Sequence, residues 1–373
     1  MNSFLTGPLV TAGLAAFLAL IISVLDRIVN NYGEVTMDIN AGKRNYKVRG
    51  GSPLLGTLAA EGIFVPSACG GRGSCGACKV KVLSDVGPHL PTETPYLTPD
   101  ELKQNVRLSC QIKLKKDIEI ELPEELFSVK KFKSKVASIK NVTHDIKEVL
   151  FKLENPDSIE FLAGQYVQIV VPPYGNFKES VQRAYSMSSR PGDNGQVELL
   201  IRLVPGGIAT TWVHQFLKEG DSVELVGPFG DFHVRETPAT MVCVAGGSGM
   251  APFKSMLYHM HEEGAHPDKD IWYFFGARTG RDMFYLDELR ALEKKMPRFH
   301  FVAALSEPSP EDNWTGDTGL ITDVLERYIK EKIDASKGLE GYLCGSPGMI
   351  NACTTVMTRN NIALEKIYYD KFA

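Results

Sequence analysis

The segment Ser67–Cys78 reads SACGGRGSCGAC and places three cysteines and four glycines within twelve residues. Its thiols follow a C-x5-C-x2-C spacing, and Cys110 comes after a gap of 31 residues. Zinc ligands normally come as two close pairs, which this spacing does not provide. Glycines let a loop wrap around a cluster with its amides toward the sulfides. The pattern therefore favours a 2Fe–2S cluster on Cys69, Cys75, Cys78 and Cys110, with zinc or disulfides as the alternatives.

The bulk composition supports ligation at this loop. A chain of 373 residues predicts two or three domains. Its net charge of −4 does not suggest a nucleic-acid partner. Four of the seven cysteines fall between Cys69 and Cys110, which is typical of a bound group rather than of a disulfide framework.

The N-terminal segment predicts a membrane anchor. Ser3–Leu25 is a run of 23 residues without a charge. As a helix it would be about 35 Å long, enough to cross a hydrocarbon core of about 30 Å. A cleaved signal peptide is the alternative. Arg27, Lys43 and Arg44 follow the run, and positive residues favour the cytoplasmic side. We expect residues 1–30 to cross a cell inner membrane once, with the soluble domains in the cytoplasm.

Three domains are expected after the anchor. Residues 31–127 show short strand patterns and one helix that begins at Ser52–Pro53, which predicts a small mixed sheet. The basic stretch 128–135 (SVKKFKSK) is expected to be a linker at the start of a domain over 128–236. In that domain strands predominate, which predicts an antiparallel β-barrel. Over 237–373 strands and helices alternate, which indicates a doubly wound parallel α/β sheet.

The stretch RAYSMSS begins at Arg183 and is predicted to form a barrel strand. Taken alone, it is also compatible with an ordinary strand that carries a surface arginine. RxYS resembles the flavin-binding signature of the ferredoxin–NADP reductase superfamily. That resemblance implies Arg183 on the FAD pyrophosphate, Tyr185 against the isoalloxazine ring and Ser186 near flavin N5. A bidentate guanidinium suits phosphate oxygens.

A second flavin element is expected at GGIATT, residues 206–211. In the same superfamily a glycine-rich turn before a helix receives the flavin phosphates, because a helix N-terminus offers free amides. The matching positions are Gly207, Thr210 and Thr211. The alternative is that Thr210 is an ordinary N-cap.

Two glycine-containing turns resemble the superfamily's nicotinamide motifs. VAGGSGMAP follows a predicted strand and opens a helix, which places Gly246, Gly247 and Gly249 at the dinucleotide. YLCGSP places Cys344 and Gly345 near the reacting carbon; the alternative for Cys344 is a structural, buried thiol.

The C-terminal tail carries one further expected site residue. In the superfamily a C-terminal aromatic residue often covers the flavin face that nicotinamide must occupy, and Phe372 is the matching position. The alternative is a frayed, merely hydrophobic end. The resemblance thus makes Ser186, Cys344 and Phe372 the residues next to hydride transfer.

The order of anchor, cysteine loop, flavin barrel and nucleotide domain resembles, along the whole chain, the F subunits of the sodium-translocating NADH:quinone reductases. LSEPSPEDNWTGDTGL at 305–320 is the most specific stretch, and the C-x5-C-x2-C…C arrangement resembles β-grasp ferredoxin domains. Two features depart from the family. The connection from Gln165 to Arg183 is short, and Ser188–Ser189 follow Met187, which leaves docking to membrane partners open.

The family implies a membrane-anchored enzyme that passes electrons from NADH through FAD and the 2Fe–2S cluster. The electrons then go to other membrane subunits and indirectly to quinone, with sodium transport in the complex. A flavin is needed because it exchanges either one or two electrons. Arg278 and Arg281 leave NADPH open as the reductant. The alternatives are a reductase that feeds an oxygenase, and a non-enzymatic membrane-tethered metal-binding protein.

Overall fold

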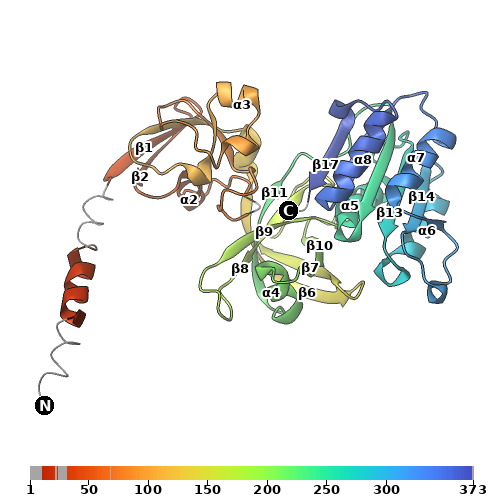
Figure 1. The fold of residues 1–373 in the computed structure, drawn as a ribbon, viewed down its shortest axis with the longest axis horizontal. Helices are drawn as coiled ribbons and strands as arrows, with labels where there is room; N and C mark the ends of the chain where they lie inside the picture. The colour runs from red at the N-terminus through yellow and green to blue at the C-terminus, as the bar shows by residue number, and fades with distance from the viewer. Residues whose placement is uncertain (1–10, 22, 24–31, 68, 372–373) are drawn as a thin grey trace, which may run out of the picture. The chain divides into compact units, whose positions relative to one another are not determined.

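The computed structural model describes residues 11–21, 23, 32–67 and 69–371. The chain divides into two compact units, Met1–Ser128 and Val129–Ala373, which are described separately (Figure 1). The three domain limits expected from the sequence stay a prediction.

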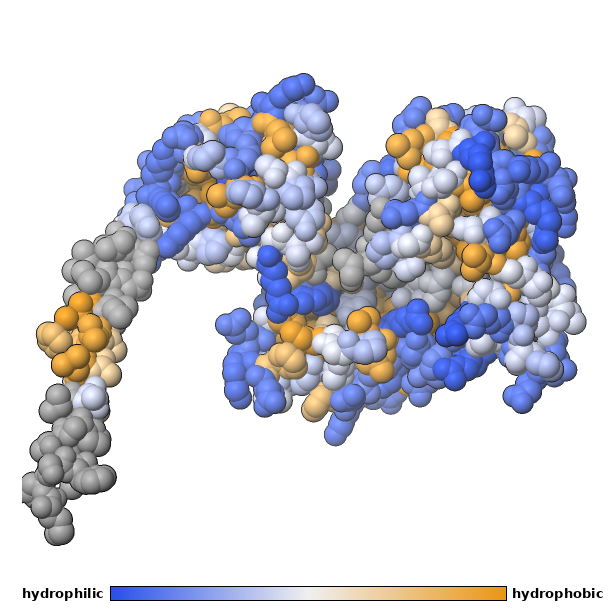
Figure 2. Space-filling view, viewed as in Figure 1, coloured by the Kyte–Doolittle hydropathy of each residue, from blue (hydrophilic) through white to orange (hydrophobic). Residues whose placement is uncertain are grey.

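Only part of the expected anchor falls within the described residues. Residues 11–21 are helical, and their surface is mostly hydrophobic in Figure 2. Leu14, Phe17 and Leu20 are each at least 60% exposed. No helix in the described parts of the chain combines the length and the apolar character needed to cross a bilayer. The anchor over residues 1–30 therefore stays a prediction, most of which lies outside the described residues.

The first unit contains a five-stranded mixed sheet. In the order β2-β1-β5-β3-β4, β1 and β5 are parallel and the other neighbours are antiparallel. Helix α2 (Leu54–Ala60) packs onto the sheet through Leu54 and Leu58. The strands are β1 (Glu34–Ile39), β2 (Arg44–Arg49), β3 (Lys79–Val82), β4 (Val106–Leu108) and β5 (Ile118–Glu121).

The helices of this unit differ from the single helix expected at Ser52–Pro53. The N-cap of α2 is Pro53, not Ser52, and no side chain caps it. Strand β4 ends at Leu108, because Ser109–Gln111 turn into a 3₁₀ helix. A short helix, α3 (Pro99–Lys103), was not expected. The capping box between Thr98 and Glu101 stabilises its start.

The second unit begins with a six-stranded antiparallel sheet in the order β10-β7-β6-β11-β8-β9. Its edges meet, since Met187 pairs with Leu199 and the Ser188 amide donates to the Glu198 carbonyl at 2.8 Å. The sheet thus closes into the expected barrel, with helix α4 (Ile208–Gln215) beside it. The strands are β6 (Lys130–Asn141), β7 (Ile146–Asn155), β8 (Tyr166–Val171), β9 (Val181–Ser186), β10 (Gln196–Arg202) and β11 (Ser222–Phe229).

The linker expected over 128–135 is wrong, because most of it is the start of β6. Phe132, Ser134 and Val136 are buried while the lysines between them face outward. This period-two burial is that of a strand. The lysine content hid the pattern.

The rest of the second unit is a six-stranded parallel sheet in the order β15-β14-β13-β12-β16-β17. Helices cover both faces: alternate residues of the strands pack on α5 and α6, or on α7 and α8 (Figure 1). This is the expected doubly wound arrangement. Its elements are β12 (Thr240–Gly246), α5 (Met250–Glu263), β13 (Ile271–Ala277), α6 (Leu286–Lys295), β14 (Phe299–Leu305), β15 (Asp317–Thr318), α7 (Ile321–Glu331), β16 (Leu339–Gly345), α8 (Pro347–Arg359) and β17 (Ile367–Lys371).

Candidate redox sites

The four thiols expected to hold iron form two hydrogen-bonded pairs, Cys69 with Cys75 and Cys78 with Cys110. Among the residues that the structure describes, no three His, Cys, Asp or Glu side chains converge as they would around one metal ion. All seven cysteines are free thiols. A zinc ion needs its four ligands at one point, whereas a two-iron cluster takes two thiolates at each iron. The pairing therefore fits a 2Fe–2S cluster better than zinc or disulfides.

The cysteine loop depends on glycine at positions where its backbone is left-handed. Gly73 has φ +73°, and a Cβ there would lie 2.6 Å from the Gln111 Nε2 atom. A Cβ on Gly76 would lie 2.7 Å from the Tyr96 Cβ atom. Tyr96 donates its hydroxyl hydrogen to the Ser74 carbonyl at 3.0 Å, which braces the loop from outside. A side chain at either glycine would therefore push the loop away from these supports.

The fourth thiol is held by the 3₁₀ turn at the end of β4. Gln111 Nε2 donates to Cys110 Sγ at 3.6 Å, and Ser109 Oγ donates to the Cys78 carbonyl at 3.0 Å. The hydrogen bond from the Cys78 thiol lowers the pKa of Cys110 to about 6 and raises the pKa of Cys78. This hydrogen bond therefore favours the thiolate form of Cys110, which is the form that binds iron.

A buried ion pair lies under this turn. Arg107 and Glu93 are 2% and 0% exposed, and Arg107 Nη2 donates to Glu93 Oε2 at 2.7 Å. Glu93 Oε1 also accepts the Leu108 amide at 3.0 Å, two residues before Cys110. The pair therefore fixes the backbone that carries Cys110, the fourth expected ligand.

The RAYS motif occupies β9, as expected. Arg183 and Tyr185 are half-buried, and Ser186 is buried. Arg183 Nη1 donates to the Gln182 carbonyl at 2.7 Å, and burial raises the pKa of Tyr185. The ligand roles of Arg183 and Tyr185 stay predictions.

Helix α4 begins at Ile208, with Gly207 as its N-cap and no side-chain cap, which leaves its first turn suited to a phosphate. Thr210 is not the N-cap. Its Oγ1 accepts the Val204 amide at 3.1 Å and so holds the turn that precedes the helix. A Cβ on Gly207 would lie 2.7 Å from that Oγ1. Thr211, in the same turn of helix, is half-buried.

The glycine loop after β12 packs tightly against the end of β16. A Cβ on Gly249 would lie 2.3 Å from the Cys344 carbonyl oxygen, so only glycine fits there. A Cβ on Gly246 would lie 3.2 Å from the Met349 sulfur, and Gly345 has φ +144°. Gly247 has φ +57° and faces the Arg202 guanidinium, which comes from the barrel. The structure thus joins both expected nicotinamide motifs at one end of the sheet.

Asp370 bonds to Ser186 and lies beside Cys344 in the neighbouring strand. Asp370 accepts a hydrogen bond from Ser186 Oγ at 2.6 Å, and in the parallel pairing of β16 and β17 it lies opposite Cys344. Burial raises the pKa of Asp370 and of Cys344. Barrel and nucleotide sheet therefore meet where hydride transfer was expected. Phe372 lies outside the described residues.

Sequence reasoning missed two residues at this junction, Asp370 and Arg202. Asp370 stands in YYDKFA, where only the tertiary contact to Ser186, 184 residues away, identifies it. Arg202 ends β10 and donates its Nε to Asp145 at 2.7 Å. A signal was present for Arg202, because a cation shortly before the GGIATT turn suggests an anion site.

A charged seam holds the nucleotide sheet against the barrel. Lys254 on α5 lies 3.5 Å from Glu148, pairs with Glu198 and lies 4.7 Å from the centre of the Tyr285 ring. Burial opposes ionisation of Glu148, but its bond from Tyr285 and the charge of Lys254 keep its pKa below the usual range. The seam therefore couples the position of α5 to barrel strands β7 and β10.

Comparison with protein families matches three stretches of the chain. Residues 37–115 match the 2Fe-2S iron-sulfur cluster binding domain, residues 133–234 the oxidoreductase FAD-binding domain, and residues 243–355 the oxidoreductase NAD-binding domain. Together they bear out the predicted cofactors, FAD, a 2Fe–2S cluster and NADH.

Relatives and solved structures resemble nearly the whole chain. The F subunit of the Na(+)-translocating NADH-quinone reductase of Pseudomonas aeruginosa is 38% identical over 99% of this chain and 98% of its own. The F subunit of the Klebsiella pneumoniae enzyme is 38% identical over 95% of each. The cytochrome P450 reductase GcoB of Amycolatopsis superposes with a TM-score of 0.72 at 28% identity, over 91% of this chain and 98% of that one. A ferredoxin reductase of carbazole 1,9a-dioxygenase gives 0.68 at 25%, over 91% and 99%.

Proposed function

This chain belongs to the family of the F subunits of Na(+)-translocating NADH-quinone reductases, and we propose that it is the electron-input component of such a complex. It is a flavin- and iron–sulfur-dependent NADH oxidoreductase. In the proposal it passes electrons to other membrane subunits and, through them, to quinone with sodium transport. Residues 1–30 anchor it once in the inner membrane, with its soluble domains in the cytoplasm.

The observation that carries the proposal is the junction of Ser186, Asp370 and Cys344, at the ends of a flavin-type barrel and a nucleotide-type sheet. When bound there, FAD would accept a hydride from NADH and release the electrons singly toward the 2Fe–2S cluster. Cys344, at the end of β16 in the nucleotide sheet, lies beside the proposed position of the nicotinamide. Ser186 and Asp370 form a hydrogen-bonded pair that holds a proton on the barrel side.

Two sets of residues hold the remaining parts of the cofactors in this proposal. Arg183 and the first turn of α4 bind the flavin phosphates, and Tyr185 packs against the flavin ring. The turn contributes Gly207, Thr210 and Thr211. Gly246, Gly247, Gly249 and Gly345 let the nicotinamide nucleotide approach the backbone, and Arg202 neutralises its pyrophosphate. Phe372 covers the flavin until nicotinamide arrives.

The test begins with the absorbance spectrum of the purified full chain. Flavin and 2Fe–2S bands that bleach on addition of NADH are expected; a spectrum without flavin would overturn the proposal. Membranes that contain the complex should then reduce quinone with NADH at a rate that rises with sodium.

One alternative function is a reductase component that feeds an oxygenase. It is supported by the solved structures that resemble this chain, a cytochrome P450 reductase and the ferredoxin reductase of a dioxygenase. Pull-down of the chain from native membranes distinguishes the two. Co-purification of a hydroxylase would favour the oxygenase alternative, whereas membrane redox subunits would favour the quinone reductase. The third hypothesis, a non-enzymatic metal-binding protein, is wrong for a chain of this family.

A further inference from the structure

A groove of about 300 Å³ lies beside the cysteine site of the first unit. One wall is apolar and contains Val86, Pro88 and Leu90, from the loop that follows β3. The other wall is the segment from Gln111 to Ile118, which leads into β5. Ligand pockets have volumes of about 300–1,000 Å³, so this groove has room for a few side chains rather than for a large cofactor.

The rim of the second wall is positively charged. Lys113, Lys115 and Lys116 are exposed, and Asp85 is the one carboxylate among the lining residues that the structure describes. Asp85 pairs with Lys116 at 3.4 Å, but the two side chains are 84% and 62% exposed. Such a pair contributes little and is readily exchanged for another. The groove therefore offers lysines to an acidic partner, in a chain whose net charge is −4.

The buried pair of Arg107 and Glu93 fixes the shape of the groove. Arg107 lines it at 2% exposure and donates Nη1 to the Gly87 carbonyl of the apolar wall at 3.0 Å. Its charge is balanced by Glu93, which has no exposed surface. The charge that a partner meets at this groove therefore comes from the lysines.

Gln111 connects the groove to the cluster site. This residue lines the groove, and its Nε2 donates to Cys110 Sγ at 3.6 Å. Its Oε1 accepts the hydroxyl hydrogen of Thr92 at 3.1 Å, which fixes the orientation of the amide. An occupant of the groove therefore lies within one side chain of the fourth expected cluster ligand.

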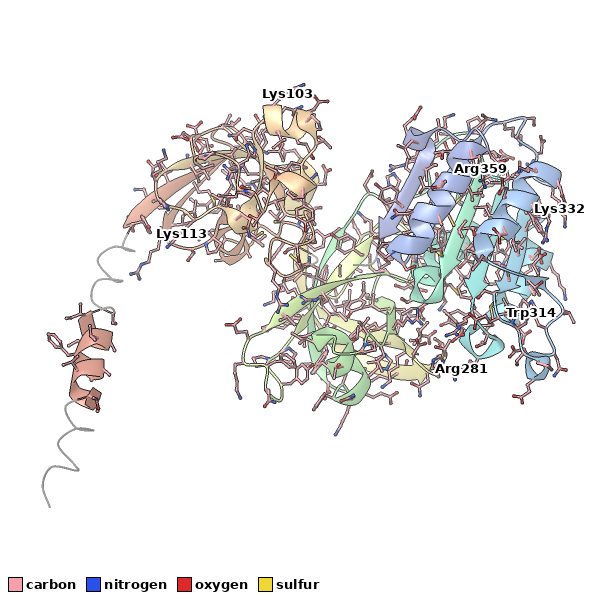
Figure 3. The ribbon with its side chains drawn as sticks, viewed as in Figure 1. Lys103, Lys113, Arg281, Trp314, Lys332 and Arg359 are labelled. Carbon is pink, nitrogen blue, oxygen red and sulfur yellow. The ribbon has the colours of Figure 1, made fainter. Side chains whose placement is uncertain are left out.

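The lysine wall also lies beside the point where the chain follows the expected anchor over residues 1–30. Lys113 Nζ is 5.3 Å from the centre of the Tyr32 ring, and Figure 3 labels Lys113 beside the start of β1. Gly51, just after β2, donates its amide to the Leu114 carbonyl at 2.7 Å, which holds this wall in place. The groove is thus close to the part of the chain that would bring it to membrane partners.

We propose that this lysine-rimmed groove is the docking surface for the membrane subunit that takes electrons from this chain, and that an acidic loop of that subunit occupies it. The inference rests on the proposed function and adds the place and the charge of the contact. A projecting loop fits a groove better than a flat layer of lipid headgroups does. Its carboxylates pair with the lysine rim, which speeds the encounter, and its apolar side chains pack on the opposite wall. One electron then passes from the reduced cluster to the redox group of the partner, which quinone reoxidises.

The complex that contains this chain, purified in a neutral detergent, tests the contact. Stopped-flow absorbance separates reduction of the flavin and cluster by NADH from reoxidation of the cluster with quinone in excess. Lys115→Glu should slow reoxidation about tenfold at low salt, and the loss should shrink as the salt concentration rises. Asp85→Asn leaves Lys116 to the partner and should speed reoxidation about twofold. Reduction by NADH precedes docking and should stay within about twofold of wild type in both variants.

Lys103→Glu is the matched control, because it reverses the same charge elsewhere on the same unit. Lys103 ends α3, its pair with Asp100 is exposed, and Figure 3 labels it at the opposite end of the unit from Lys113. It should change reoxidation by less than about twofold. Equal slowing in Lys103→Glu, or an unchanged rate in Lys115→Glu, would overturn the inference.

The choice of neutral detergent separates a protein partner from a lipid surface. Slowing by Lys115→Glu that appears only in vesicles with phosphatidylglycerol, and is absent in the detergent, would assign the groove to anionic lipid and overturn the proposal. Failure of the proposed function would instead appear in the wild type, as a cluster that NADH reduces but that quinone does not reoxidise.

Discussion

Replacement of Arg107 by Met tests how the cluster loop is supported. The Arg107 guanidinium makes three contacts to the Glu93 carboxylate, at 2.7, 3.1 and 3.2 Å, and donates to the Gly87 carbonyl at 3.0 Å. Glu93 has no exposed surface. Without Arg107 its charge would be buried and unpaired.

The size of the effect follows from that burial. Removal of one partner from a buried ion pair costs about 3–5 kcal/mol. For a domain of about 100 residues, each kcal/mol lowers the melting temperature by roughly 4–8 °C. Arg107→Met should therefore lower the melting temperature of the iron–sulfur domain by more than about 12 °C. It should also weaken cluster retention, because Glu93 holds the Leu108 amide beside Cys110.

Thermal unfolding of the full chain gives the melting temperature and denaturant unfolding gives the free energy, both followed by the visible circular dichroism of the cluster. The double variant Arg107→Met/Glu93→Gln removes the unpaired charge of Glu93 but keeps an acceptor for the Leu108 amide. It should therefore recover much of the stability that Arg107→Met loses. Lys79→Met is the matched control. It breaks a pair with Glu101 whose side chains are 34% and 28% exposed, and should cost less than about 1 kcal/mol.

The difference in unfolding free energy between wild type and Arg107→Met should depend on pH in a definite direction. Burial of Glu93 opposes ionisation, but its bonds from Arg107 and from the Leu90 and Leu108 amides hold its pKa below the usual range. The pair's contribution is therefore full above the unfolded pKa of about 4.3 and is lost as the pH falls through the lower folded pKa. The stability gap between wild type and Arg107→Met should narrow below about pH 4. A gap under 1 kcal/mol at pH 7, or one independent of pH, would refute the reasoning.

Three further substitutions test the remaining parts. Cys110→Ser should abolish the cluster spectrum yet leave NADH reduction of the flavin intact in stopped-flow measurements; loss of both would contradict separate modules. Asp370→Asn should slow that reduction about 100-fold. Because burial raises the pKa of Asp370, the wild type should lose stability relative to Asp370→Asn as the pH rises above about 4. A stability difference between the two proteins that does not change with pH would contradict the raised pKa. Lys254→Met leaves Glu148 and Glu198 without their shared cation and should lower kcat about tenfold at normal flavin content. Lys254→Arg keeps the charge and should leave kcat unchanged. Equal losses of kcat in the two variants would exclude a role of the charge.

Short-range chemistry could be predicted from the sequence. Ligands of one cluster must stand at fixed, close spacing, so the cysteine loop indicated its cofactor before any fold was known. Glycine turns beside strands were also predictable, because a positive φ or a close backbone approach restricts those positions to glycine. The β6 strand was missed because alternating lysines made a buried strand resemble a polar linker.

The pairing of partners distant in the chain depended on the tertiary structure. The sequence alone determined the order of the family's motifs and which four cysteines are the candidate cluster ligands, since both are local patterns. Only the fold decided that Cys69 pairs with Cys75 and Cys78 with Cys110, that Asp370 reaches Ser186, and that Glu307 holds Arg278. The physical reason is that contact across strands is set by sheet register and burial, which act between residues that no sequence spacing connects.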